Sequence, residues 1–494
     1  MQGHDFQGLF GRRKLLWQTR WGFYCLGIDE LCPIGAVLSV DDSPAHSMIS
    51  KQTDASFFSL ESNWGWRVAG QDSIIEEIVP ALGEHVVRLL SRSAENWTAI
   101  STHPSPALLQ FAARMGIACI CPPPELCDWL NDKANFLTAV AEIGLPRLNG
   151  CWVRLSEMSY ADLHKHVGAS FAAQLPRGCS GSGTFFVGCE DDYVQLAADR
   201  GNALMWVVPD VGDLSLNVNA IATDRGTAVG YPSVQLARVT RLCRNRGQYC
   251  GNDYAATAGL ERQIVEAVVV QTARIGEWLA SLGYCGLFGL DFVVDNGCNQ
   301  VYAVDLNPRW QGSTWLLGQA QRELGRLPLP VAEVGYRMGL LSAAEVLRNS
   351  DEFLSPVWVS QFALRSQEPG WSTIGSAVEP GIYSFADGVG GPRPTLRLRD
   401  LENDAEFLLV GVPRADLKIA PGGHMLRVCS RGPVYDLARA RLLARAEHAA
   451  RQLYLSLALT VAEPPNGNNS RRQTSGDIAE SSNQCHQSAR NIPD

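Results

Sequence analysis

The sequence predicts an α/β protein built from about three structural units, and three regions carry that prediction. In the first 120 residues of the 494, short apolar stretches alternate with helical patterns, which is typical of a parallel sheet covered by helices. Residues 260–282 form a long helical pattern, and strong β signal follows from Leu287 to Leu306. Residues 150–210 and 355–462 each mix helix and strand patterns, which indicates two α+β units.

The alternating region has apolar runs of strand length separated by longer segments of helical periodicity. No GxGxxG follows any of these strands, so the region predicts no dinucleotide site. The expected strands are residues 34–40, 98–102 and 117–121, and the expected helices are 72–91, around Pro80, and 106–115.

Pro122, Pro123 and Pro124 end that unit, and a helix is expected in the following segment. Asn131 or Asp132 can cap it, since short polar side chains accept hydrogen bonds from the first free backbone N–H groups. The apolar face is supplied by Phe136, Leu137, Val140 and Ile143, and the helix ends at Gly144 with Pro146.

Overall composition excludes several classes of function. The net charge of −9 argues against non-specific nucleic-acid binding, which needs a basic surface. The basic run Arg12–Lys14 is followed by too short an apolar stretch to read as a signal peptide, and no uninterrupted apolar segment could cross a membrane. We therefore expect a cytoplasmic protein that engages neither nucleic acid nor membrane.

The most informative stretch is residues 286–314, where two β-rich runs flank a turn cluster at Asp295–Cys298. If the turn centres near Cys298, residues whose numbers sum to about 596 lie opposite each other, and Asp291 and Asp305 meet that condition. Directly opposed side chains point to one face, with Cβ atoms roughly 4.5 to 5.5 Å apart. Asn307 and Arg309 share the face of Asp305, while the core-facing set is expected to be Leu290, Phe292, Val304 and Leu306.

Two opposed carboxylates repel each other, and a hard divalent cation removes that cost. Mg²⁺ takes oxygen ligands and is commonly held by one or two carboxylates together with substrate phosphates. The pattern therefore predicts a magnesium–nucleotide site, with Arg309 near the transferring phosphoryl group. The alternative is a solvated polar face with a chance carboxylate pair.

This stretch resembles the ATP-grasp superfamily, which includes biotin carboxylase, carbamoyl-phosphate synthetase and D-alanine–D-alanine ligase. The family pattern is an acidic residue, a turn, then a second acidic residue followed by x-Asn-x-Arg. The resemblance implies that Asp291, Asp305 and Asn307 bind Mg²⁺, with Mn²⁺ as the alternative, and that Arg309 contacts the reacting phosphate or carboxylate. The second acidic position is usually Glu, and Asp305 is one methylene shorter.

The resemblance extends over residues 125–345. Lys133 matches a family lysine that reaches the nucleotide phosphates, although a capped surface helix would read the same way. Residues 171–187 resemble a strand, a glycine-rich phosphate loop and a returning strand, although a plain hairpin turn is the alternative. Gln174 stands where the family usually has a phosphate-binding Lys. The loop tip would be Ser180, Gly181, Ser182 and Gly183, and the backbone of Trp206, Val207 and Val208 would bond the adenine edge.

Residues 212–226 read as two strands with polar side chains alternating on one face, and Gln235 is a weaker substrate-facing candidate. A run of arginines follows, which either binds a carboxylate or phosphate or forms a solvated loop. The polar face comprises Asp213, Ser215, Asn217 and Asn219, and the arginines are Arg238, Arg241, Arg244 and Arg246.

The domain layout that the resemblance implies has four parts. They are a pre-ATP-grasp α/β domain at 1–122, an ATP-grasp domain at 123–345 with a lid at about 150–210, a C-terminal α+β domain at 355–462, and a polar tail at 463–494. The tail is too poor in apolar residues to order itself.

The implied function is an ATP- and Mg²⁺-dependent ligase that activates a small-molecule carboxylate as an acylphosphate and joins it to an amine, forming an amide or peptide bond. An ATP-dependent carboxylase and a non-catalytic nucleotide-binding protein remain as alternatives. The expected partners are the carboxylate and amine substrates, and assembly as a homodimer is left open.

Overall fold

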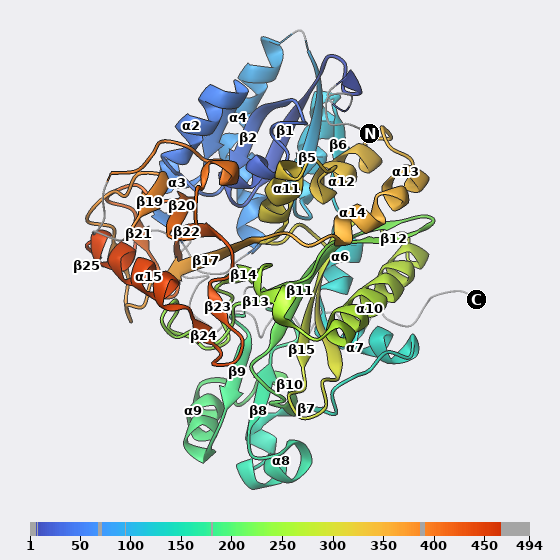
Figure 1. Cartoon of the computed structure of the whole chain (residues 1–494), viewed down its shortest axis with the longest axis vertical. Helices are drawn as coiled ribbons and strands as arrows, with labels where there is room; N and C mark the ends of the chain where they lie inside the picture. Colours follow the sequence, from blue (N-terminus) through green and yellow to red (C-terminus); the bar gives the residue numbers. More distant parts are fainter. Residues whose placement is uncertain are drawn as a thin grey trace.

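The computed structural model describes residues 6, 8–67, 72–93, 95–178, 181–385 and 391–465. In Figure 1 the N-terminal domain lies at the top, a large sheet crosses the middle, and residues 151–209 form a separate lobe at the bottom. The α/β fold class predicted from the sequence is confirmed.

The N-terminal domain is built on a five-stranded parallel sheet with the order β3-β2-β1-β5-β6. The chain order reverses between β1 and β5, and such a switch point opens a crevice at the carboxyl ends of the strands. The strands are β1 (Arg13–Thr19), β2 (Ile34–Ser39), β3 (Ser56–Ser59), β5 (Asn96–Ser101) and β6 (Ala118–Ile120), and the helices are α2 (Ala45–Thr53), α3 (Glu61–Trp64), α4 (Ile78–Ser91) and α5 (Pro106–Met115), with 3-10 turns η1 (Gly22–Gly27) and η2 (Asp72–Glu77).

The expected strands near 34–40, 98–102 and 117–121 and the expected helices near 72–91 and 106–115 are all present. The central strand β1 was not among the predicted strands. Its sequence RKLLWQT begins with charged residues, and its last five residues are buried on both sides, so it shows no period-two alternation.

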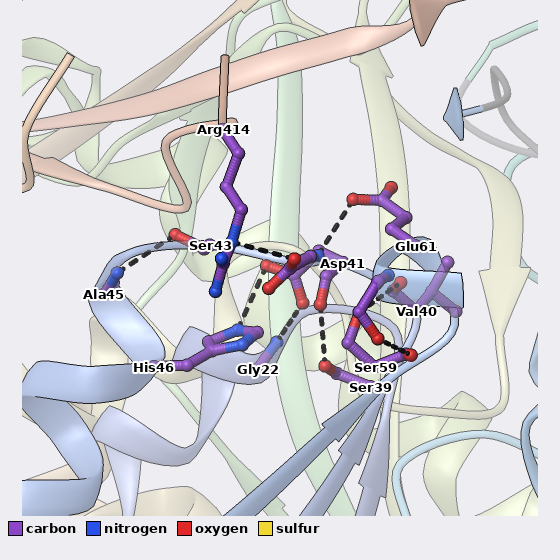
Figure 2. A network of polar contacts seen from close by, with 12 residues as sticks. Gly22, Ser39, Val40, Asp41, Ser43, Ala45, His46, Ser59, Glu61 and Arg414 are labelled. Carbon is purple, nitrogen blue, oxygen red and sulfur yellow. Dashed lines mark hydrogen bonds and ion pairs between the residues drawn. The ribbon is translucent and has the colours of Figure 1, made fainter. Parts of the chain in front are cut away.

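A buried polar network fixes the segment that follows β1 (Figure 2). Asp41 accepts a hydrogen bond from the Gly22 N–H at 2.6 Å and lies 3.4 Å from Nε2 of His46. Although burial alone would raise it, His46, Arg67 and the Gly22 N–H together lower the pKa of Asp41, which is therefore ionised. Arg414, from the C-terminal region, joins the network through Asp42 at 2.8 Å. The network holds residues 20–22 in a defined position at the end of β1.

The centre of the molecule is a ten-stranded antiparallel sheet with the order β16-β15-β11-β13-β14-β17-β22-β20-β19, and β12 pairs with β11 at one side. Its strands are β11 (Ser215–Thr223), β12 (Gly226–Val229), β13 (Ser233–Gln235), β14 (Gly251–Asp253), β15 (Gly286–Val294), β16 (Val301–Asn307), β17 (Val359–Arg365), β19 (Gly381–Ser384), β20 (Glu406–Val410) and β22 (His424–Arg431).

The C-terminal region shares this sheet, so residues 355–462 do not form a free-standing unit. β14 pairs with β17, and β22 and β20 continue the same ladder. Sequence spacing could not show this because more than a hundred residues separate β14 from β17. Residues 466–494, most of the tail expected at 463–494, lie outside the described residues.

The β15–β16 hairpin confirms the predicted register, since Asp291 lies opposite Asp305 and Leu290 opposite Leu306. A bulge between Asp291 and Phe292 then shifts the pairing, so that Phe292 faces Ala303. The expectation that Val304 faces the core is therefore wrong. The extra residue of a bulge leaves the ladder, and Val304 instead lines a cavity.

The lobe at residues 151–209 has a four-stranded antiparallel sheet of order β7-β10-β8-β9 and a core of its own, which includes Leu163, Phe171 and Leu196. The expected strand–loop–strand at 171–187 is confirmed as β8 and β9. The elements are β7 (Cys151–Arg154), α8 (Tyr160–Val167), β8 (Phe171–Gln174), β9 (Thr184–Val187), α9 (Glu190–Arg200) and β10 (Leu204–Pro209), with the 3-10 turn η3 (Leu155–Glu157).

The remaining helices pack around the sheet. Asp132 caps α7 by accepting from the Ala134 N–H, as expected. These helices are α6 (Pro124–Leu130), α7 (Lys133–Glu142), η4 (Ala256–Gly259), α10 (Arg262–Ser281), α11 (Thr314–Glu323), α12 (Leu329–Arg337), α13 (Ala343–Arg348), α14 (Ser350–Leu354), η5 (Leu398–Asp400) and α15 (Ala444–Ser456).

Two small sheets complete the fold. One, of order β25-β18-β21-β4, joins the N-terminal domain to the C-terminal region. Within the described ranges, no helix has the length and apolar character needed to cross a membrane. The short strands are β4 (Trp66–Arg67), β18 (Ser372–Thr373), β21 (Lys418–Ile419), β23 (Tyr435–Asp436), β24 (Arg441–Leu442) and β25 (Thr460–Val461).

Candidate active site

A cavity of about 210 Å³ lies where the four parts of the fold meet. The lobe contributes Gln174 and Phe186, the hairpin contributes Asp291 and Asp305, and the C-terminal strands and the N-terminal domain close the opposite end. Of the residues singled out from the sequence, Lys133, Gln174, Gly181, Gly183, Asp291, Asp305, Asn307 and Arg309 all line this cavity.

Asp291 is held in place from two neighbouring strands. The Asn217 amide donates to its Oδ1 at 2.6 Å, and the Gln235 amide donates to the same atom at 3.1 Å. Burial, and then the facing Asp305, raise the pKa of Asp291 to about 6. The carboxylate pair is therefore poised to gain a cation, which would relieve both the burial and the repulsion.

Asp305 is more exposed, at 28% of its side chain, and pairs with the ammonium group of Lys133. The Asn307 amide donates to its other oxygen at 3.4 Å. Lys133 is 8% exposed and starts α7, whose cap fixes its backbone. In this structure the lysine supplies the positive charge beside the carboxylate pair.

The donor set fits Mg²⁺. Two carboxylates and an amide oxygen, all on one hairpin face, are oxygen ligands of the kind that this hard cation takes. The fit rests on Asp291, whose partly buried carboxylate lies opposite a second carboxylate.

Gln311 belongs to the same hydrogen-bonded group as Asp291 and Asn217. Its Oε1 accepts from the Asn217 amide at 2.9 Å, and its side chain lies against the backbone of Gly289. A Cβ added at Gly289 would lie 1.9 Å from Cδ of Gln311, so a larger residue at this strand position would displace the Gln311 side chain. Arg309 lies two residues before Gln311 and lines the same cavity.

The loop between β8 and β9 reaches the core of the molecule. Gly181 has a φ of +76°, and a Cβ there would lie only 1.7 Å from the carbonyl oxygen of Gly247. Gly247 is equally close to the loop, because its own added Cβ would lie 2.3 Å from the carbonyl oxygen of Thr184. Two backbones touch here, and only glycine allows it. Ser182 is exposed, and Ser180 lies outside the described residues.

A second cavity of about 80 Å³ adjoins the first and shares Gln174, Thr184 and Phe186 with it. The side chains of Trp206 and Val208 line it, together with Leu137 and Leu148. Its largely apolar walls and flat aromatic groups could hold a planar base.

The expectation that the backbone of Trp206, Val207 and Val208 bonds an adenine edge stays a prediction, and the strand pairing bears on it differently for each residue. β10 is an interior strand, and Trp206 and Val207 are in register with both β7 and β8, so their polar backbone groups serve the sheet. Val207 is fully buried and lines neither cavity. Val208 is in register with β8 only and borders the second cavity, together with residues 210–212 that follow the strand.

The prediction of a polar face on two strands over residues 212–226 is partly confirmed. Ser215 and Asn217 line the cavity from a single strand, β11, rather than from two. Asp213 instead pairs with Arg238 at 2.9 Å, which also pairs with Asp210 and lies 3.7 Å above the Phe186 ring. Arg238 is thus a structural support of the cavity wall.

The opposite end of the cavity was missed by the sequence reasoning. It is lined by basic and aromatic side chains from β17, β22, η1, the segment before β14 and the carboxyl ends of β1 and β5. A usable signal existed: HMLRVCS places an arginine inside an apolar strand run, where charged residues are rarely buried without a role. These residues are Arg20, Trp21, Tyr24, His103, Tyr249, Arg365, His424 and Arg427.

Comparison by sequence identifies nothing: no family model matches the chain, and no curated protein matches it. By structure, the chain is similar to the biotin carboxylase domain of the 2-oxoglutarate carboxylase of Hydrogenobacter thermophilus, a complex with MgADP, ADP and bicarbonate. The TM-score is 0.53 with 14% identity, over 85% of this chain and 86% of that one.

Two further structures show the same likeness. Biotin carboxylase from Campylobacter jejuni has a TM-score of 0.53 and 13% identity, over 85% of this chain and 87% of that chain. N5-carboxyaminoimidazole ribonucleotide synthetase from Thermus thermophilus has a TM-score of 0.51 and 14% identity, over 92% of this chain and 100% of that chain. Likeness at such low identity establishes a shared fold.

Proposed function

Because the chain has the ATP-grasp fold, as its resemblance in sequence predicted, we propose that it is an ATP- and Mg²⁺-dependent ligase. In this proposal it activates a small-molecule carboxylate as an acylphosphate and joins it to an amine. The observation that carries the proposal is the opposed pair Asp291 and Asp305, which shares one cavity with Asn307, Arg309 and the glycine-rich loop.

The two adjoining cavities suggest how the nucleotide lies. The base would occupy the smaller cavity against Trp206 and Val208, and the phosphates would pass Gln174 and Thr184 into the larger one. This direction brings the terminal phosphate to the carboxylate pair.

Asp291, Asp305 and Asn307 would hold Mg²⁺, which would supply charge neutralisation and orientation of the phosphate oxygens. Asn217 and Gln235 keep Asp291 in position, because each donates to its Oδ1. Lys133 pairs with Asp305 in this structure, so binding of the metal and nucleotide would release its ammonium group toward a phosphate.

The proposed chemistry has two steps. An oxygen of the substrate carboxylate attacks the γ-phosphorus of ATP, the bond to the β–γ bridging oxygen breaks, and ADP leaves. The amine nitrogen then attacks the acyl carbon, the bond to the phosphate oxygen breaks, and the amine loses a proton as phosphate departs. The guanidinium of Arg309 would stabilise the negative charge on the transferring group.

The lobe at residues 151–209 would act as the lid that keeps water from the acylphosphate. Its separate core lets it move as a unit, and the contact between Gly181 and Gly247 brings its loop onto the connection between β13 and β14. Limited proteolysis of the loop at 178–184, with and without Mg-ATP, tests this role. Cleavage that Mg-ATP does not slow would contradict the lid assignment.

The direct test of the ligase proposal is ADP release with Mg-ATP, hydroxylamine and pooled small carboxylic acids, including amino acids and short peptides. Hydroxylamine traps an acylphosphate as a hydroxamate whatever the natural amine is. A hydroxamate that disappears in Asp305→Ala supports the proposal and identifies the acid, whereas AMP in place of ADP rules the mechanism out.

An ATP-dependent carboxylase is the second candidate, favoured by the likeness to two biotin carboxylase structures. Bicarbonate would then be the acid that is activated. ADP formation that depends on bicarbonate, and on no organic acid in the pool, would select this candidate over the first.

A further inference from the structure

Two buried arginines at the far end of the cavity lack a carboxylate partner. Arg365 on β17 is 5% exposed and Arg427 on β22 is 2% exposed, and both line the cavity. Throughout the part of the chain that the structure describes, neither forms an ion pair. Arg365 donates only to the carbonyl oxygens of Tyr249 and Gly422, and Arg427 donates to the hydroxyl of Tyr249 at 3.2 Å.

The buried Arg67 and the largely buried Arg397, by contrast, are both paired with carboxylates. Arg67 donates to both oxygens of Glu61 at 2.6 and 2.7 Å, and Arg397 donates to both oxygens of Asp29. Burying an uncompensated guanidinium is costly, so a fold that pairs these arginines and leaves two cavity arginines unpaired points to a ligand as the missing counter-ion.

His424 gives an independent indication at the same place. Both of its ring nitrogens are buried and have no hydrogen-bond partner, although its side chain lines the cavity. Burial, followed by Arg427 and Arg365, lowers the pKa of His424 well below its usual range, so the ring is neutral and offers one N–H donor. The ring packs against Trp21, with 4.4 Å between centroids, and Arg67 donates to the carbonyl oxygen of His424 at 3.2 Å, so its position is fixed.

The Nε of Arg427 is likewise buried without a partner. Buried donors in native proteins are nearly always satisfied, and here three unpartnered polar groups belong to two side chains that line one cavity. An oxyanion would satisfy the donors among them together with the charge.

We propose that Arg365, Arg427 and His424 form an anion subsite that binds a carboxylate or phosphate group of the substrate other than the carboxylate being activated. Its part in turnover rests on the proposed ligase function, whereas its ability to bind an anion does not.

The subsite is separate from the metal site. Between Asp291 and Arg427 runs a chain of neutral hydrogen-bonding side chains: Asn217 donates to Asp291, Asn252 donates to Asn217 at 3.3 Å, and Tyr249 links Asn252 to Arg427. Three residues therefore lie between the carboxylate pair and this guanidinium. Arg309 lies two residues beyond the end of the strand of Asp305 and is assigned to the reacting end in the proposed function, which leaves the arginines of β17 and β22 for a second charged group. The substrate is accordingly expected to carry at least two anionic groups.

The first test measures binding without nucleotide. Thermal unfolding of the full chain is followed against inorganic phosphate at constant ionic strength, in the wild type, in Arg427→Met and in Arg262→Gln. Arg262 is the control because its side chain is 90% exposed on α10, outside the cavity. We expect phosphate to raise Tm in a saturable manner in the wild type and in the control, and this rise to be lost in Arg427→Met.

Arg427→Met itself should not unfold the protein. It removes an unpaired buried charge and keeps much of the volume, so its Tm without phosphate should equal or exceed that of the wild type. Arg427→Lys provides a second variant that keeps the charge, and we expect it to retain part of the phosphate-dependent rise. A rise in Tm that is unchanged in Arg427→Met would overturn the subsite.

The second test identifies the anion. Hydroxamate formation is compared for monocarboxylates, dicarboxylates and phosphorylated carboxylic acids. We expect one of the two dianionic classes to be preferred, and Arg427→Met to raise its KM by about tenfold or more with a smaller effect on kcat. Equal use of monocarboxylates, with KM unchanged in the variant, would refute the inference.

The two tests separate the inference from the proposed function. If no acid yields a hydroxamate while Arg427→Met still abolishes the phosphate-dependent rise in Tm, the ligase is refuted and the anion subsite stands.

Discussion

Replacing Gly181 with alanine should block closure of the proposed lid while leaving the fold intact. The added Cβ would lie 1.7 Å from the carbonyl oxygen of Gly247, and real Cβ atoms essentially never approach closer than 3.0 Å. Both partners are backbone, so no rotamer change relieves the overlap, and the loop must withdraw by about 1.3 Å, the difference between these distances. The φ of +76° adds about 1–2 kcal/mol for an L-residue.

A displacement of about 1 Å in a phosphate-binding loop can cost about 100-fold in rate, because reacting groups lose alignment and water enters. We therefore expect kcat/KM for ADP release to fall about 100-fold in Gly181→Ala. The separate core of the lobe is untouched, so Tm should change by no more than about 4 °C.

Gly168→Ala is the matched control. Gly168 lies in the same lobe with a φ of +91°, and a Cβ there meets no atom within 4 Å. This variant carries backbone strain without the contact, and we expect its kcat/KM to stay near that of the wild type. The reasoning fails if Gly181→Ala keeps full activity, or if Gly168→Ala loses as much activity as Gly181→Ala.

Three further predictions concern the cavity. Asp305→Asn should lower Mg-ATP turnover by at least about 100-fold, because it removes one of two carboxylates; steady-state ADP release across a Mg²⁺ titration measures this, and full activity at saturating Mg²⁺ would contradict it. Gln174→Lys should tighten ATP binding by about tenfold, because a lysine adds a charge-assisted contact where the glutamine makes only a 3.4 Å hydrogen bond to Thr184. Titration calorimetry measures the affinity for ATP in both proteins, and weaker binding by the variant would show that the glutamine suits its site. Burial and neighbouring arginines depress the folded-state pKa of His424. The stability that keeping this ring neutral contributes is present above about pH 6.5 and is lost as the pH falls, because only the unfolded state gains the proton. Between pH 7.5 and 5.5 the wild type should thus lose about 1.4 kcal/mol more than His424→Asn in denaturant titrations, and parallel pH profiles would exclude this assignment.

The hairpin could be predicted from the sequence because its determinants are local. The turn residues Asp295–Cys298 and the period-two alternation set the register, and Asp291 does lie opposite Asp305. The bulge beside Asp291 could not be foreseen, since nothing in the local sequence distinguishes Val304 from its neighbours. One inserted residue was enough to reverse the side that Val304 faces.

The basic end of the cavity depends on pairing between distant segments. Arg365 and Arg427 approach the hairpin only because β14 pairs with β17 and β17 with β22, and such long-range pairings leave no periodic signal in either strand. The side-chain types gave a partial signal, as an arginine within an apolar strand is unusual. They could not reveal which cavity the arginine enters.

The shared sheet also sets the order in which the protein can mature on the ribosome. β14 ends at Asp253, whereas its neighbour β17 begins only at Val359, so the nascent chain carries an unfinished sheet edge while more than a hundred residues are added. An unpaired edge of this kind is a site for aggregation until its neighbour arrives. The part of the sheet that carries the carboxylate pair can therefore form first, and the basic end of the cavity comes into existence only when β22 is inserted.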